Sequence, residues 1–341
     1  MKTLFRAFTL LLLAAILLLS LTSCGEDYKM RESSEKEATP VFTLGEDTVN
    51  FEVLYTFFRN RLEVAGLRED QLDDGRYEAI LNEAKAEIAE IYALFAVCRS
   101  VGIDPESEEV EERITEYLKM NVEGGVVGDT WIEGYESYDD YLADIKDKYH
   151  MNDAVNRLML RYAVCEDLLA SYYQASYPYT EGDVRAFFEG EDCLHIVWVG
   201  RTESDGGLGR EENLDLMERI KGKLESGDIR GAVGLSMRQD TDFYMGRYSK
   251  DEAYYGELIE IAYGLDVGET SRVLDLGTAG FFVVKRLEKS SSDLADRYEE
   301  IEEVFLADAM YERVDTKGAE LLEGIVYMDA YNSLTIGDFF D

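Results

Sequence analysis

Hydrophobic residues recur at the spacing of an α-helix along most of the chain between 51 and 188. The first stripe consists of Phe51, Leu54, Tyr55, Phe58 and Leu62. Comparable stripes predict further helices over about 77–100, from Pro105, from Ser137, from Asn152 to Pro178, and over 184–188 after a cap at Thr180. A helix with one apolar face must cover that face, so we expect these helices to pack around a common core.

Two short runs near the start, 41–44 and 48–50, flank a turn and predict a hairpin that leads into the first helix. At the other end of the chain, a helix is expected from 294 to about 323, followed by an apolar run at 325–327. Because two strands alone are marginally stable in water, this last run could add a third strand to the hairpin.

The middle of the chain has a different pattern. It opens and closes on runs rich in β-branched and aromatic residues, 193–199 and 280–287, which predict buried strands. Between these runs, helical spacing predicts helices over 213–224 and 254–265, and a further short strand is expected at 272–276. This mixture predicts a compact α+β domain.

The first 24 residues have the pattern of an export signal. Two basic residues precede the apolar stretch 8–19, and Leu21-Thr-Ser-Cys24 follows it. This tetrapeptide resembles the bacterial lipobox, which implies lipid on Cys24. A plain secretory signal or a single membrane span is the alternative, although a span needs about 20 apolar residues. Residues 24–40 are charged and poor in apolar side chains, so they are predicted to form a tether.

The chain of 341 residues carries a formal net charge of −38. A charge of this sign and size excludes nucleic acid as a partner. It also argues against a body that lies flat on an anionic membrane, and it keeps an exported protein soluble.

The chain has few residues that could bind a metal or form disulfides. Apart from Cys24, the cysteines are Cys98, Cys165 and Cys193, whose spacing predicts neither a zinc site nor a disulfide framework. Cys98 and Cys165 fall at apolar helix positions and are interpreted as small buried hydrophobes. The chain has only two histidines and no phosphate loop or nucleophile elbow, so no metal or cofactor is predicted.

Several fragments between 192 and 287 resemble, in order and spacing, those of parvulin-type peptidyl-prolyl isomerases. They are His195-Ile196 in the first strand, Lys223-Leu-Glu-Ser-Gly227, Met245-Gly-Arg-Tyr248 and Leu265-Asp-Val-Gly268-Glu-Thr-Ser271. The resemblance implies a proline-binding pocket. It makes His195 and Asp240 the candidate catalytic residues, and the candidate substrate-binding residues are Met245, Tyr248, Tyr254, Leu258 and Phe281.

One departure from the parvulin pattern bears on mechanism. The family carries a second histidine in a Gly-Tyr-His-Ile context, where this chain has Gly280-Phe-Phe-Val283. Twisting a prolyl bond needs no nucleophile, because an apolar pocket that binds the twisted amide lowers the barrier of about 20 kcal/mol. Because the histidine pair is nevertheless broken, we expect isomerase activity to be weak or lost.

The N-terminal half is similar to the opening domain of PrsA- and SurA-type foldases, at 41–58, at 100–110 and at the junction 180–184. In such foldases, a helix after the isomerase block returns to the N-terminal domain. The resemblance implies an α+β fold in which a mostly helical domain, completed by a C-terminal helix, contains an inserted parvulin-like domain. The predicted division is 1–23 signal, 24–40 tether, 41–190 helical domain, 191–289 parvulin-like domain and 290–341 C-terminal helix and strand.

These observations favour a lipid-anchored foldase or chaperone on the extracytoplasmic face of the membrane. Its expected partners are unfolded, newly exported polypeptides, the membrane through Cys24, and a second copy of the chain in a homodimer. A non-catalytic docking lipoprotein on the same scaffold is the alternative. A solute-binding lipoprotein is less favoured, because the chain lacks the alternating strand–helix units of a two-lobed parallel sheet.

Cys24→Ala is expected to release the protein from the membrane fraction and to leave its fold intact, because the anchor is lipid on that one side chain. Fractionation in high salt and thermal unfolding measure the two effects. A variant that stays with the membranes in high salt would contradict the lipobox interpretation.

Overall fold

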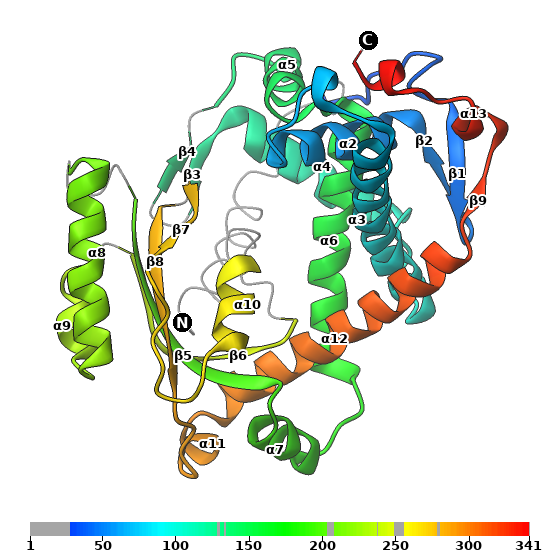
Figure 1. Ribbon diagram of the computed structural model, residues 1–341. Helices are drawn as coiled ribbons and strands as arrows, with labels where there is room; N and C mark the ends of the chain where they lie inside the picture. Colours follow the sequence, from blue (N-terminus) through cyan, green and yellow to red (C-terminus); the bar gives the residue numbers. More distant parts are fainter. Residues whose placement is uncertain are drawn as a thin grey trace. The chain divides into compact units, whose positions relative to one another are not determined.

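The computed structural model describes residues 28–127, 130–132, 134–202, 208–236, 238–248, 256–277 and 280–340. The predicted signal segment and Cys24 lie outside these residues. The chain forms two compact units. The first ends at Leu169 and resumes at Arg313, and the second, Ala170–Glu312, is inserted between its two parts (Figure 1). The predicted α+β class, with an α+β domain inserted into a mostly helical one, is confirmed.

The first unit is mainly helical. In chain order it contains β1 (Pro40–Leu44), β2 (Asp47–Asn50), α2 (Phe51–Val64), η1 (Glu69–Gln71), α3 (Asp74–Ser100), α4 (Glu108–Glu123), β3 (Gly125–Val127), β4 (Thr130–Ile132), α5 (Tyr138–Tyr149), β9 (Val326–Tyr327), α13 (Asp329–Asn332) and η4 (Ile336–Phe339). Two long helices, α6 (Asp153–Ser176) and α12 (Tyr298–Glu323), contain the points at which the chain passes between the units. The boundaries predicted near 190 and 289 therefore fall inside the second unit.

The second unit is built on one antiparallel sheet. Its elements are α7 (Glu181–Glu189), β5 (Cys193–Arg201), α8 (Arg210–Glu225), α9 (Ile229–Val233), β6 (Arg238–Gly246), α10 (Gly256–Gly264), β7 (Leu274–Asp275), β8 (Phe281–Leu287) and α11 (Asp293–Asp296). The strand order is β6-β5-β8-β7. Figure 1 shows α8 and α10 on opposite faces of this sheet.

The three-stranded sheet of the first unit joins the two ends of the chain. Its order is β2-β1-β9, and Phe42 of β1 pairs with Tyr327 of β9. The predicted hairpin and the predicted third strand are both confirmed. The C-terminal tail continues into the same core, because Phe339 is fully buried with its ring centroid 4.2 Å from that of Phe58.

The N-terminal segment, residues 28–39, does not hang free as a tether. The backbone N–H of Arg31 donates to Asp153 at 2.6 Å, and its guanidinium pairs with Asp139 at 2.8 Å. The Tyr28 ring lies edge-on to Tyr138 with centroids 5.5 Å apart. A tether was predicted because the segment is charged and poor in apolar side chains. The sequence of the segment does not show that Asp153 of α6 supplies a buried acceptor for its backbone.

Local signals placed most helix ends correctly. Ser137 accepts the backbone N–H of Asp140 at 3.1 Å to start α5, and Thr180 forms a capping box with Asp183 to start α7. One position differs. The helix expected from Pro105 starts after Ser107, whose hydroxyl caps it. The β3–β4 hairpin was not predicted.

The strand β6 was not predicted. Its sequence places charged or polar residues at most positions of its first half, so only Phe243, Tyr244 and Met245 carry a strand signal. Pairing with the apolar β5 over nearly its whole length decides its conformation.

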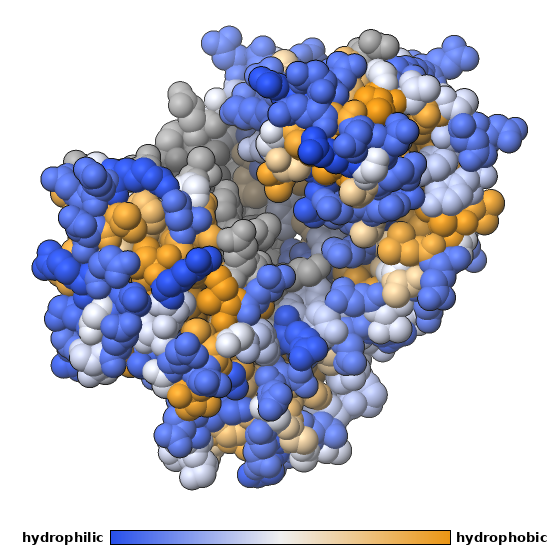
Figure 2. Space-filling view, viewed as in Figure 1, coloured by the Kyte–Doolittle hydropathy of each residue, from blue (hydrophilic) through white to orange (hydrophobic). Residues whose placement is uncertain are grey.

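The surface agrees with the acidic composition. The face seen in Figure 2 is largely hydrophilic, with apolar residues gathered over the strands beside α8. Among the residues that the structure describes, no helix is long and apolar enough to cross a membrane.

Asp153→Ala is expected to lower the stability of the first unit by about 3–5 kcal/mol, because it leaves the buried Arg157 without its carboxylate partner at 3.0 Å. It should also expose Lys29, Arg31 and Lys36 to trypsin. Asp139→Ala is the matched control, since this exposed partner of Arg31 contributes at most about 1 kcal/mol. Equal losses in the two variants, measured by urea unfolding, would contradict the expectation.

Candidate functional site

His195 lies on the central strand β5, between Tyr244 of β6 and Leu287 of β8. Successive side chains of a strand point to opposite faces. His195 therefore shares a face with Cys193 and not with the apolar Leu194 and Ile196. On that face, the neighbouring cluster contains Cys193 and Tyr244 of the sheet with apolar residues of α7 and α12.

Both ring nitrogens of His195 face oxygen acceptors. Nδ1 lies 3.0 Å from the backbone oxygen of Glu288, and Nε2 contacts the carboxylate of Asp242. The ring also stacks on Tyr244, with centroids 4.6 Å apart and planes 20° apart. A ring held on both nitrogens and one face is fixed in position.

A β-bulge brings Asp242 to His195. Ile196 pairs with Phe243 and Trp198 with Asp240, so two residues of β6 lie opposite the single Val197. One of them, Asp242, has a φ of 62°, in the left-handed region that few residues other than glycine adopt. The bulge changes the direction of the Asp242 side chain, so that its carboxylate contacts both His195 and Arg297, the latter at 3.3 Å.

Tyr244 and Arg297 extend this arrangement into a polar network, defined here as His195, Asp242, Tyr244, Asp293 and Arg297. The guanidinium carbon of Arg297 lies 4.9 Å from the centroid of the Tyr244 ring, and the Tyr244 hydroxyl donates to Asp293 at 2.5 Å. Burial raises the pKa of Tyr244, and the hydrogen bond to Asp293 raises it further. Burial alone would raise the pKa of Asp293, but hydrogen bonds from Ser290 and Tyr244 bring it below its usual value.

Arg297, which precedes α12, and side chains of α12 also form hydrogen bonds with the outer edge of β6. The backbone N–H of Tyr244 donates to the carboxylate of Glu300 at 3.3 Å, and Arg297 donates to the backbone oxygen of Asp242. Farther along, the N–H of Tyr248 donates to Asp308 at 2.8 Å. An edge strand leaves backbone groups unpaired, and these side chains take the place of a further strand.

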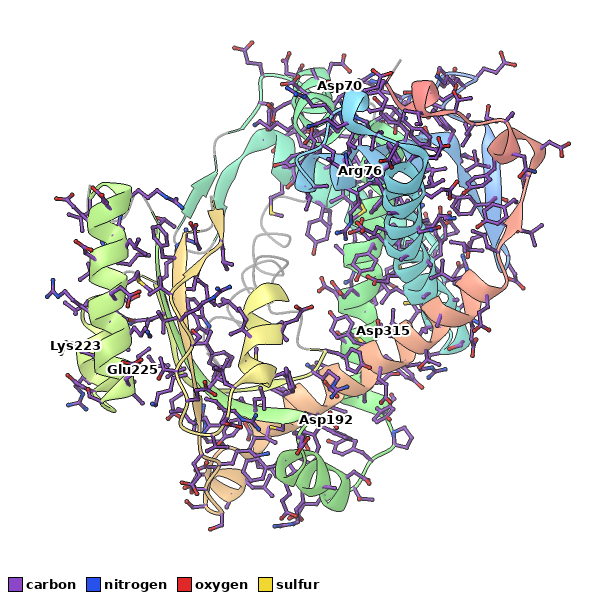
Figure 3. The ribbon with its side chains drawn as sticks, in the orientation of Figure 1. Asp70, Arg76, Asp192, Lys223, Glu225 and Asp315 are labelled. Carbon is purple, nitrogen blue, oxygen red and sulfur yellow. The ribbon has the colours of Figure 1, made fainter. Side chains whose placement is uncertain are left out.

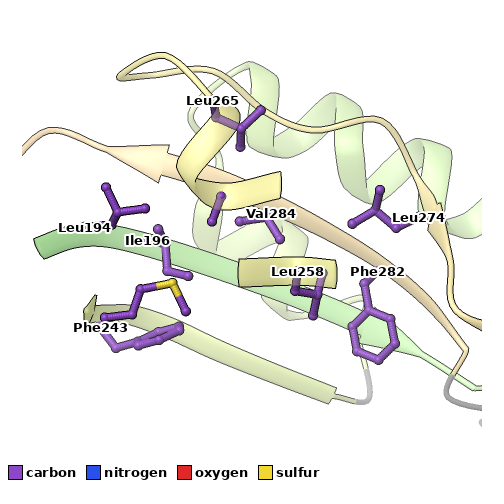
Figure 4. Packing of buried hydrophobic residues seen from close by; sticks show 10 residues of the cluster. Leu194, Ile196, Phe243, Leu258, Leu265, Leu274, Phe282 and Val284 are labelled. Atoms are coloured by element: carbon purple, nitrogen blue, oxygen red, sulfur yellow. The ribbon is translucent and has the colours of Figure 1, made fainter. Parts of the chain in front are cut away.

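The opposite face of the sheet is apolar. Figure 4 shows Leu258 of α10 and Leu265, which follows that helix, in one cluster with Leu194, Ile196, Phe243, Leu274, Phe282 and Val284. Leu258 is 3% exposed and Met245 is 5% exposed. Both side chains are therefore buried among the apolar residues of this cluster.

The structure brings together only some of the predicted site residues. Met245 and Leu258 share the apolar cluster under α10. Phe281 points to the other face and packs with Met217 and Ile220 of α8. His195 lies on that second face too, next to α12.

The remaining predicted site residues are placed differently. Tyr248 is half-buried at the end of β6. The backbone of Asp240 pairs with Trp198 inside β6, and Tyr254, like Cys24, lies outside the described residues.

The residues that hold His195 were missed from the sequence. The alternation in Asp242-Phe-Tyr-Met245 would have indicated a strand with one polar and one apolar face, but no local signal connects it to Asp293 and Arg297. No group of histidine, cysteine and carboxylate side chains suited to a metal occurs in the part of the chain that the structure describes.

Asp308 makes the second unit sensitive to pH. Burial raises the pKa of Asp308 to about 6, and the charge of Asp192, labelled at the start of β5 in Figure 3, also raises it. In the unfolded chain, an aspartate titrates near pH 3.9. Between about pH 4 and pH 6 the folded state therefore binds more protons than the unfolded state, and the free energy of unfolding falls as the pH rises.

Asp308→Asn is expected to remove this contribution while keeping an acceptor for the Tyr248 N–H. From pH 4 to pH 7, the wild type should lose about 1–2 kcal/mol more stability than the variant, after allowance for partial exposure. Chemical unfolding at several pH values measures the difference. Asp296→Asn, at an exposed position of α11, controls for the loss of one negative charge. Parallel pH profiles of wild type and Asp308→Asn would contradict the assignment.

No protein-family model and no curated protein matches the chain. It is similar to solved structures of PrsA from Bacillus subtilis, at 15% identity and a TM-score of 0.27, covering 84% of this chain and 93% of that chain. It is also similar to the foldase PrsA of Streptococcus pneumoniae, at 14% identity and a TM-score of 0.28, covering 86% of this chain and 97% of that chain. A structure of the SurA-like chaperones PEB4 and Cj1289 of Campylobacter jejuni matches at 13% identity and a TM-score of 0.28, covering 85% of this chain and 99% of that chain. These are the classes of protein that the sequence motifs resemble.

Proposed function

We propose that this protein is a lipid-anchored, extracytoplasmic foldase or chaperone that binds newly exported, unfolded polypeptides and has weak or no prolyl isomerase activity. The ordered fragments at His195-Ile196, 245–248 and 265–271 support the kinship with parvulin-containing foldases. The strands expected at the start and end of the block are present as β5 and β8. They lie side by side in the sheet, and β6 pairs with the other edge of β5.

One observation carries the proposal that isomerisation is weak. Phe282 is one of the two residues that stand where the family's second histidine would be. Its side chain is fully buried in the core under α10, while His195 lies on the opposite face. Position 282 therefore cannot supply a second imidazole beside His195. Two of the apolar side chains proposed to hold a proline, Met245 and Leu258, are buried in the same cluster.

A chaperone also needs apolar contacts for unfolded chain, and the first unit offers candidates. Val64 at the end of α2 is 80% exposed, and Tyr149 at the end of α5 is 50% exposed. The contact between His150 and Glu63 at 2.7 Å holds these two helix ends together. Aromatic and aliphatic side chains at the surface supply contact area for extended polypeptide without demanding a particular sequence.

The docked N-terminal segment bears on how the anchor would act. If Cys24 carries lipid, only residues 25–27 separate it from Tyr28, where the contacts with the first unit begin. Four residue steps span at most about 14 Å. The proposed chaperone would therefore work close to the membrane surface where exported chains emerge.

Suppression of aggregation tests the proposed function. The protein is expected to reduce light scattering from a thermally unfolded client enzyme such as citrate synthase at near-stoichiometric ratios. Val64→Asp combined with Tyr149→Asp should weaken this effect without lowering the melting temperature, because both side chains are exposed. Leu214→Asp, at an exposed position of α8 in the second unit, is the matched control. Full aggregation in the presence of the wild type would favour the docking lipoprotein instead.

Prolyl isomerisation is tested separately with a proline-containing tetrapeptide. His195→Ala should change any residual rate by less than about tenfold, since a general acid–base role typically contributes 100-fold or more. Leu258→Ala should lower stability by about 2–5 kcal/mol, because a buried side chain is removed. A folded His195→Ala variant that has lost a high wild-type activity would show that the histidine is catalytic.

A further inference from the structure

Two cysteines meet in the core of the first unit. Cys98 lies on α3 and Cys165 on α6, and both are fully buried. The sulfur of Cys98 is 3.6 Å from the backbone oxygen of Cys165, although 67 positions separate the two residues in the chain. Both belong to the same unit, and both are free thiols in this structure.

The two thiols also influence each other. A side-chain hydrogen bond between them raises the pKa of Cys98 and lowers the pKa of Cys165. The positive charges of Arg161 and Arg99 lower the pKa of Cys165 further, although its burial acts in the opposite direction. Either sulfur can act as the nucleophile once its thiol is deprotonated, because the thiolate is the reactive form.

Cys193 provides the contrast. It lies alone in the second unit, where burial raises the pKa of its thiol to about 12. Burial is common to all three cysteines, but only Cys98 and Cys165 are in contact with each other. The side chain of Cys98 on α3 reaches the backbone of Cys165 on α6.

We propose that Cys98 and Cys165 form a disulfide bond that links α3 to α6 when the protein meets a disulfide oxidant. The thiolate of one cysteine attacks the oxidant RSSR, which forms a mixed disulfide and releases one RS⁻. The thiolate of the other cysteine then attacks the protein sulfur of the mixed disulfide and releases the second RS⁻. The two thiol protons pass to the released thiolates, so the protein pair is oxidised as RSSR is reduced to two RSH.

The bond would act mainly on the unfolded chain. It closes a loop of 67 positions that contains α4, the β3–β4 hairpin and α5. Cross-linking a loop of this length removes much of the freedom of the unfolded state, if the native geometry accepts the bond without strain. Because both sulfurs are buried, oxidation must take place before the core closes or during local opening. The proposal is independent of the proposed chaperone function.

The test uses the full chain, refolded from urea in oxidised glutathione or in excess dithiothreitol. Unpaired thiols are then blocked with iodoacetamide under denaturing conditions, and the peptides are mapped by mass spectrometry. The oxidised sample is expected to contain one linked pair of peptides, carrying Cys98 and Cys165, two hydrogens lighter than their sum. Its melting temperature should exceed that of the reduced sample by roughly 5–10 °C.

Variants separate the bond from other effects of oxidation. Cys98→Ala and Cys165→Ala should each abolish the linked peptide and the shift in melting temperature. Cys193→Ala, which removes the third buried cysteine, should retain both. The proposal is overturned if refolding in oxidant leaves Cys98 and Cys165 alkylated, attaches glutathione to either without linking them, or pairs Cys193 instead. A linked pair that lowers the melting temperature would overturn the stabilising role.

Discussion

The ammonium group of Lys289 holds together the two ends of the sheet domain. It donates to the backbone oxygens of Phe188, Gly190 and Cys193 at 2.5, 2.6 and 3.0 Å, which uses all three of its hydrogens. These oxygens lie where the chain enters β5, and Lys289 lies where the chain leaves β8. The contact therefore joins the start of β5 to the end of β8 within the second unit. Burial lowers the pKa of Lys289, so the contact depends on a charge that the surrounding carbonyls must solvate.

The two faces of the sheet in the second unit differ in polarity. On the α10 face, Met245, Leu258 and Phe282 pack into a closed apolar core. On the other face, His195 is held by Asp242 and Glu288 and covered by Tyr244. Catalysis by a histidine pair would need imidazoles on one face beside an open pocket. This division between the two faces of the sheet is the observation behind the proposal that isomerisation is weak.

The bulge at Asp242 shows how backbone geometry and charge act together. A left-handed residue in a strand costs free energy, and it persists where the surroundings repay that cost. Here the carboxylate contacts both His195 and Arg297, and Arg297 in turn bonds the backbone oxygen of the same residue. The same contacts attach the edge of β6 to α12, so the network protects an edge strand that would otherwise be open to pairing with other chains.

The sequence by itself determined the elements whose signals are local. The stripe from Phe51 to Leu62, the cap at Ser137 and the hairpin before α2 depend on neighbouring residues, and each forms as predicted. The strand β9 was predicted because a two-stranded hairpin needs a third strand. Tertiary structure decided what depends on distant partners. These include the nine-residue strand β6, the docking of residues 28–39 on Asp153, the burial of Phe339, and the meeting of Cys98 with Cys165. It also decided the surroundings of His195, whose partners lie 47 and 93 positions away. A periodic pattern records which face of an element is apolar, but it does not record which other element will cover that face.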